Sequence, residues 1–95
     1  MKSILCIVNP VSGLEKSLKV YYEVEKKIVN AGFSPKLFTT SYAGHATEYV
    51  STLKPNEFDR VLVFGGDGTV NETVNGLYQA DLLTHFPLGI IPTGS

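Results

Sequence analysis

The sequence is poor in cysteine, because Cys6 is the single one among 95 residues. A lone cysteine excludes an internal disulfide framework and a metal site built from several thiolates. Cys6 lies inside the apolar run SILCIVN, where a thiol behaves as a small hydrophobic group. We therefore expect a buried thiol in a reducing cytosol and not a reactive nucleophile.

The chain also lacks a long hydrophobic run. The first apolar segment, which follows Lys2 and ends at Asn9-Pro10, is too short to span a bilayer and has no small-residue cleavage site. No targeting signal is readable, so we expect a cytoplasmic protein.

An excess of either charge is absent as well. The net charge is -1, the eight basic residues are scattered, and 43% of the residues are hydrophobic. This balance gives no reason to expect binding to nucleic acid, and the length allows one small domain.

Apolar runs and helical periodicities alternate along the chain. Strands are predicted at Ser3 to Asn9, Lys36 to Thr39, Arg60 to Phe64 and Leu88 to Ile91, and helices at Glu15 to Ala31, His45 to Leu53 and Val70 to Tyr78. Three of the strands are continuously apolar, as in a parallel sheet that is covered on both faces. The order β-α-β-α-β-α-β predicts a doubly wound, three-layer α/β domain with a mostly parallel sheet.

The last strand is followed directly by Pro92-Thr93-Gly94-Ser95, with no helix to cover it. We therefore expect residues 1–95 to be the N-terminal part of a larger protein. A sheet edge or apolar face left uncovered in such a part makes a homodimer one expected assembly.

The sharpest motif is VLVFGGDGTVNE, from Val61 to Glu72. Its glycines let backbone N–H groups approach a ligand at a helix start, which favours phosphate. The motif lacks the Gly-Lys-Ser/Thr of a P-loop and the third glycine of a dinucleotide fingerprint. Asp67 at its centre either helps to hold a water-coordinated Mg²⁺ against phosphate oxygens or hydrogen-bonds its own turn.

Two further patterns have a structural and a functional interpretation. Thr69 and Glu72 form a capping box at the expected start of the third helix, and Ser12 with Glu15 forms another at the first helix. These residues are caps, ligands, or caps that also orient ligand-binding amides. His45 is a candidate for capping or for contacting a ligand, and no neighbouring residues are spaced to share zinc with it.

Together these residues resemble the catalytic domain of the diacylglycerol kinase and sphingosine kinase family. The resemblance runs through Asn9-Pro-Val-Ser-Gly13, Thr40 with Gly44-His45-Ala46, Gly65 to Glu72, Val74-Asn75-Gly76 and Pro87 to Ser95. A Gly-Gly-Asp-Gly loop alone is shared with phosphofructokinases and NAD kinases, whereas the combination is more specific.

The resemblance implies ATP-dependent, Mg²⁺-assisted phosphorylation of a lipid hydroxyl, with diacylglycerol or a similar lipid met at the membrane surface. The implied ATP-binding residues are Asn9, Gly13, Thr40, Gly66, Asp67, Gly68, Thr69, Val70, Asn71, Glu72 and Ser95. Asp67 is the implied catalytic and metal residue, acting on the metal through water. The family's general base and its β-rich lipid-binding domain have no counterpart in residues 1–95, so these residues alone are expected to be inactive.

Three other functions stay open: a sphingosine or long-chain-base kinase, a soluble NAD kinase or phosphofructokinase-like enzyme, and a non-catalytic nucleotide-binding domain.

Overall fold

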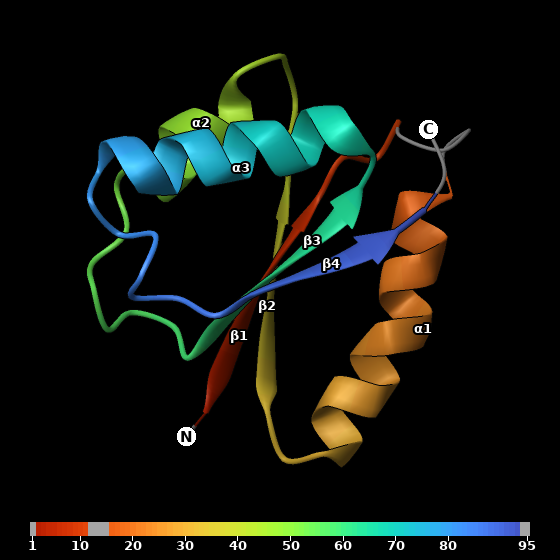
Figure 1. Ribbon diagram of the computed structural model, residues 1–95. Helices are drawn as coiled ribbons and strands as arrows, with labels where there is room; N and C mark the ends of the chain where they lie inside the picture. Colours follow the sequence, from red (N-terminus) through yellow and green to blue (C-terminus); the bar gives the residue numbers. More distant parts are fainter. Residues whose placement is uncertain (1, 12–15, 94–95) are drawn as a thin grey trace.

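A computed structural model of the chain describes residues 2–11 and 16–93. Its strands are β1 (Ser3–Val8), β2 (Ser34–Thr39), β3 (Arg60–Gly65) and β4 (Leu88–Pro92), and its helices are α1 (Ser17–Asn30), α2 (His45–Val50) and α3 (Asp67–Gln79). All strand pairs are parallel, in the order β2-β1-β3-β4. Helix α1 covers one face of the sheet, and α2 and α3 cover the other (Figure 1). The predicted doubly wound α/β fold is confirmed.

The central strands are apolar throughout because both of their faces are covered. Successive side chains of a strand point to opposite faces, and in β1 this sends Leu5 and Ile7 into a core with α2 and α3. Cys6 and Val8 belong to the other core, which α1 covers. Cys6 is fully buried, as predicted, and its burial raises the pKa of the thiol to about 12.

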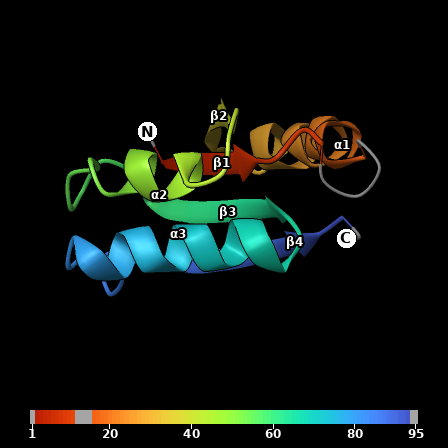
Figure 2. The same ribbon diagram turned by 90° about the horizontal axis from the view of Figure 1, so that it is seen from above.

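The order of the strands fixes where a ligand can bind. From β1 the chain passes through α1 to β2 at one edge, then returns through α2 to β3 on the other side of β1. The direction of winding therefore reverses between β1 and β3, and a crevice opens there beyond the carboxyl ends of the strands. Figure 2 shows β1 and β3 pointing the same way, with the start of α3 directly after β3.

The start of β2 and the end of α2 differ from the prediction, each with an identifiable cause. Strand β2 begins at Ser34, two residues early, because the Ser34 N–H donates to the carbonyl of Lys2 at 2.8 Å. Pro35 is tolerated there since β2 is an edge strand. Helix α2 ends at Val50, before the predicted Leu53, because the Leu53 N–H bonds the Val50 carbonyl in a tighter turn at 3.2 Å.

Helix α1 begins at Ser17 and not at Glu15, with Lys16 as its N-cap residue. Ser12 and Glu15, the predicted capping box of this helix, lie outside the described residues. The buried face of α1 includes Tyr21, whose hydroxyl donates to a carboxylate oxygen of Glu25 at 3.0 Å. Its ring meets the Phe64 ring edge-on at 5.6 Å. Burial has the largest effect on the pKa of the Tyr21 hydroxyl and raises it, and the hydrogen bond to Glu25 raises it further.

Helices α2 and α3 cross closely at Gly76. A Cβ atom at this position would lie 2.7 Å from the Thr47 carbonyl oxygen and against the Val50 side chain. Next to the crossing, the Thr47 hydroxyl donates to the carbonyl oxygen of Glu72 at 2.7 Å. The contact therefore fixes α3 against α2. None of the helices in the described residues is long and apolar enough to cross a membrane.

Candidate functional site

A pocket of about 540 Å³ lies at the carboxyl end of the sheet. Its walls come from the segments that follow β1 and β2 and from the first two turns of α3. The lining residues are Asn9, Pro10, Val11, Thr39, Thr40, Ser41, Tyr42, Ala43, Thr69 and Glu72. Parts of the chain far apart in sequence thus meet at the place that the strand order favours for a ligand.

The wall that follows β1 is shaped by Asn9. Its side-chain oxygen accepts the Val11 N–H at 3.1 Å, which closes a tight turn of the kind that asparagine favours. The Asn9 N–H points back to the carbonyl of Phe64 at 3.4 Å and ties this segment to the end of β3. Asn9 therefore lines the pocket and also fixes the turn that leads into it.

The start of α3 corrects one prediction. The expected capping box of Thr69 and Glu72 is wrong, because α3 begins at Asp67 and its N-cap residue is Gly66 in an extended conformation. Thr69 is instead the third residue of the helix, 94% buried and facing the pocket. The chain turns at Gly66, so α3 begins at Asp67, two residues before Thr69.

No side-chain cap is bonded to the α3 N-terminus in the part of the chain that the structure describes. The first N–H groups of a helix have no partner within it and carry the positive end of the helix dipole. The Val70 N–H is already used, since it donates to the Gly66 carbonyl at 3.2 Å. The amides that precede Val70 are the ones this turn can offer to an anion.

Asp67 lies at the first position of α3 and is exposed to solvent. It does not line the pocket, although Thr69 and Glu72 on the same helix do. Within the described residues no group of three or more His, Cys, Asp or Glu side chains could hold a metal ion. A metal bound here would therefore depend on ligands that this part of the chain does not supply by itself.

The segment after β2 is ordered by aromatic side chains. Tyr42 stacks on the imidazole of His45 with ring centres 4.3 Å apart, and Phe38 stacks on Tyr49 at 3.9 Å. A hydrogen bond to Glu48 raises the pKa of the exposed Tyr42 hydroxyl. The Tyr42 ring is thus a structural partner of the His45 ring.

The predicted site residues fall into three groups. Four line the pocket, five lie on α3 or at its start without lining it, and two lie outside the described residues. The three groups are Asn9, Thr40, Thr69 and Glu72; Gly66, Asp67, Gly68, Val70 and Asn71; and Gly13 and Ser95. Three lining residues were not predicted, namely Ser41, Tyr42 and Ala43, and their place between Thr40 and His45 was the signal that could have indicated them.

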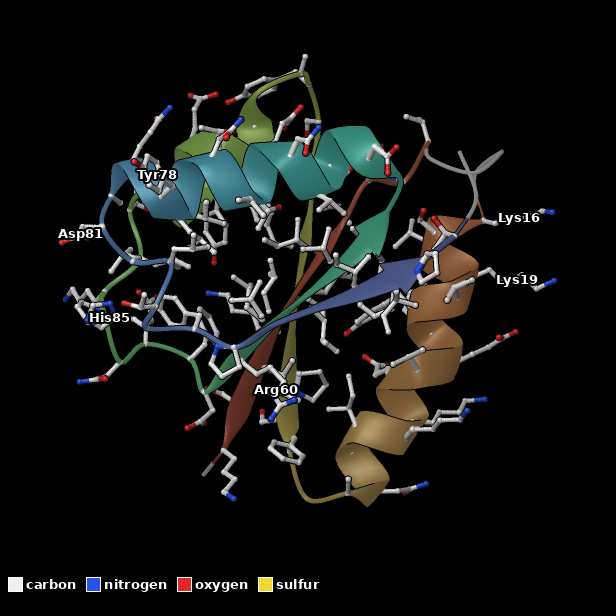
Figure 3. All side chains as sticks on the ribbon, viewed as in Figure 1. Lys16, Lys19, Arg60, Tyr78, Asp81 and His85 are labelled. Atoms are coloured by element: carbon white, nitrogen blue, oxygen red, sulfur yellow. The ribbon has the colours of Figure 1, made fainter. Side chains whose placement is uncertain are left out.

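The described lining of the pocket carries no basic side chain, because none of its residues is lysine or arginine. Lys16 and Lys19 point outward at the start of α1, and Arg60 lies at the start of β3 (Figure 3). The beginning of α1 is bound to the end of β4 by a buried pair of hydroxyl groups, Ser17 and Thr93, whose oxygens are 2.7 Å apart.

The sequence matches the model of the diacylglycerol kinase catalytic domain over residues 3–95. The chain belongs to this family. Among its curated relatives, diacylglycerol kinase from Bacillus subtilis is 41% identical over 95 residues, covering 100% of this chain and 31% of that protein. Sphingoid long-chain bases kinase 1 from Arabidopsis thaliana is 40% identical and covers 96% of this chain and 13% of that protein.

The crystal structure of a diacylglycerol kinase from Bacillus anthracis has the same fold. It superposes with a TM-score of 0.71 at 35% identity, over 98% of this chain and 31% of that one. The family resemblance inferred from the motifs is therefore confirmed. The chain spans about a third of the length of these bacterial diacylglycerol kinases.

Proposed function

We propose that this chain is the N-terminal, nucleotide-binding part of a cytoplasmic lipid kinase that phosphorylates diacylglycerol or a similar lipid with ATP. The observation that carries the proposal is the pocket at the reversal point of the sheet, lined by Asn9, Thr40, Thr69 and Glu72 in a chain of the diacylglycerol kinase family. Segments that are remote in sequence supply these side chains, as a nucleotide site requires.

The chemistry of the pocket fits a nucleotide. Hydroxyl groups of Thr40, Ser41 and Thr69 and the carboxylate of Glu72 can hydrogen-bond a ribose or a base. The uncapped start of α3 offers backbone N–H groups to phosphate oxygens. Its glycines, Gly66 and Gly68, permit close approach, and a Cβ at Gly68 would meet nothing within 4 Å.

Mg²⁺ fits the site only when the phosphates of the nucleotide supply some of its ligands. Mg²⁺ is commonly bound through one or two carboxylates together with substrate phosphates and water. The exposed Asp67 can supply one such carboxylate, acting through water, at the same helix start. When bound, the cation would offset phosphate charge, because the described pocket lining has no lysine or arginine to do so.

In the proposed reaction the lipid hydroxyl oxygen attacks the γ-phosphorus. A new oxygen–phosphorus bond forms, the bond from that phosphorus to the β,γ-bridging oxygen breaks, and ADP leaves. The hydroxyl proton passes to a base outside residues 1–95. We propose that this base and the lipid groove belong to the remainder of a longer protein, so that residues 1–95 bind nucleotide but do not turn over.

The lipid acceptor is met by peripheral association with a membrane surface. Diacylglycerol is the first candidate, and a sphingoid long-chain base is the second because of the 40% identity to the Arabidopsis relative. Homodimerisation stays a prediction; the exposed Ile90 on the edge strand β4 is consistent with it.

An acceptor panel tests the proposal. The full-length protein would be incubated with γ-labelled ATP and Mg²⁺ and with dioleoylglycerol, sphingosine, NAD or fructose 6-phosphate as the acceptor. We expect labelled lipid and no labelled NAD or sugar phosphate. Label on the soluble acceptors alone would contradict the proposal, and turnover of dioleoylglycerol by residues 1–95 alone would contradict the assignment of the base.

A further inference from the structure

The imidazole of His45 contacts the wall of the pocket without lining it. Its ring stacks on the Tyr42 ring at 4.3 Å with an interplanar angle of 11°. It also meets Phe38, on β2, edge-on at 4.8 Å. The ring is thus held between the strand and the segment that follows it, and that segment supplies Thr40, Ser41, Tyr42 and Ala43 to the pocket.

Two hydrogen bonds close this segment into a compact turn. The Ser41 N–H donates to Nδ1 of His45 at 2.9 Å, and the His45 N–H donates to the Tyr42 carbonyl at 3.1 Å. Nδ1 accepts this hydrogen bond through its lone pair, so the ring acts here as an acceptor for a backbone N–H. The imidazole therefore bonds the backbone of the pocket wall and does not itself face the pocket.

The residue before His45 makes this geometry accessible. Gly44 has a φ angle of 89°, in the left-handed region that other residues rarely adopt. This conformation reverses the chain, so that α2 starts with the imidazole directed back to Ser41. Gly44 thus allows the turn, and His45 stabilises it through the hydrogen bond to Ser41.

We propose that His45 is a positioning residue of the nucleotide site, which holds the segment from Thr40 to Ala43 in its binding conformation before the nucleotide arrives. The inference rests on the proposed function. Ordering a loop during binding costs free energy, so a wall that is ordered beforehand strengthens binding. Loss of the hydrogen bond to Ser41 should therefore raise the KM for ATP and leave kcat nearly unchanged.

Three substitutions separate the hydrogen bond from the ring. His45→Asn keeps an acceptor atom near the place of Nδ1 and loses the stacked ring. His45→Phe keeps a ring and loses the acceptor, and His45→Ala loses both. His85 provides the matched control, because it is an exposed histidine in the turn before β4, beyond the far end of α3 (Figure 3).

Steady-state kinetics of the full-length protein with ATP and dioleoylglycerol give the first readout. We expect the KM for ATP to rise about tenfold in His45→Ala and His45→Phe, to stay within about threefold of wild type in His45→Asn, and to be unchanged in His85→Ala. A wild-type KM in all three variants would overturn the inference. So would equal effects of His45→Asn and His45→Phe, or a fall in kcat without a change in KM.

Amide hydrogen exchange at Ser41 gives a readout that needs no activity. The Ser41 amide should be protected in the wild type and in His45→Asn and should exchange faster in His45→Phe. Equal exchange rates of the Ser41 amide in His45→Asn and His45→Phe would contradict the inference. This comparison does not depend on the folding of His45→Ala. Failure of the proposed function has a different appearance, since the wild type itself would then neither bind ATP nor phosphorylate the lipid.

Discussion

Replacing Gly76 by alanine should loosen the packing of α2 against α3. The added Cβ would lie 2.7 Å from the Thr47 carbonyl oxygen and would collide with a methyl group of Val50. The methyl group can move, but the carbonyl belongs to the backbone of α2 and cannot move alone. The two helices must therefore separate, and the 2.7 Å hydrogen bond from Thr47 to the Glu72 carbonyl must lengthen with them.

The size of the effect follows from two opposed contributions. Overpacking of a tight contact costs about 1–3 kcal/mol. Alanine in place of glycine within a helix stabilises the folded protein by about 1 kcal/mol through its higher helix propensity. Because the collision is with backbone, the cost lies in the upper part of its range, and the free energy of unfolding should fall by about 1–2 kcal/mol. For a domain of this size the midpoint of thermal unfolding should fall by roughly 5–10 °C.

Thermal unfolding followed by circular dichroism measures this difference. Gly68→Ala is the matched control for stability, because it makes the same change in the same helix at a position where a Cβ meets nothing within 4 Å. It should be as stable as wild type or slightly more so. A midpoint for Gly76→Ala equal to or above that of Gly68→Ala would refute the close crossing of α2 and α3.

Three further outcomes are expected. Asp67→Asn in the full-length protein should lower kcat by on the order of 10²-fold while the unfolding midpoint barely changes, because the carboxylate is exposed; full activity would make Asp67 a turn residue. In urea, the free energy of unfolding should fall as pH rises from 9 towards 12, because the unfolded chain releases the Cys6 proton before the folded protein does, and Cys6→Ala should weaken that dependence. For the buried hydroxyl pair, a double-mutant cycle of Ser17→Ala and Thr93→Val should give a coupling energy of about 1 kcal/mol, whereas zero coupling would remove the link between α1 and β4.

The architecture was accessible from the sequence because its determinants are local. The continuous apolar run around Cys6 predicts a strand that is covered on both faces, and the alternation of strands and helices predicts the crossovers. The carboxyl ends of the strands then locate the site without knowledge of any contact. The family resemblance implied Asn9, Thr40, Thr69 and Glu72 as ATP-binding residues, and these four line the same pocket.

The details that could not be predicted depend on the backbone conformation of single residues or on tertiary contacts. Whether Thr69 caps α3 or lies inside it depends on the backbone of Gly66, which is extended and lets the helix begin at Asp67. The bond from Ser41 to the His45 ring requires the left-handed turn at Gly44, and nothing in a pattern of side chains specifies it. Tyr21 is buried because Phe64 comes from a distant strand to meet it.

Titration of the full-length protein with MgATP in a calorimeter tests the central claim most directly, namely that the pocket between α3 and the segments after β1 and β2 binds the nucleotide. The account predicts one bound nucleotide per chain. Thr40→Val should weaken binding by about five- to tenfold, because it removes a hydroxyl that lines the pocket, while His85→Ala should have no effect. Absence of MgATP binding to the folded wild-type protein, or equal affinities for wild type and Thr40→Val, would contradict the claim.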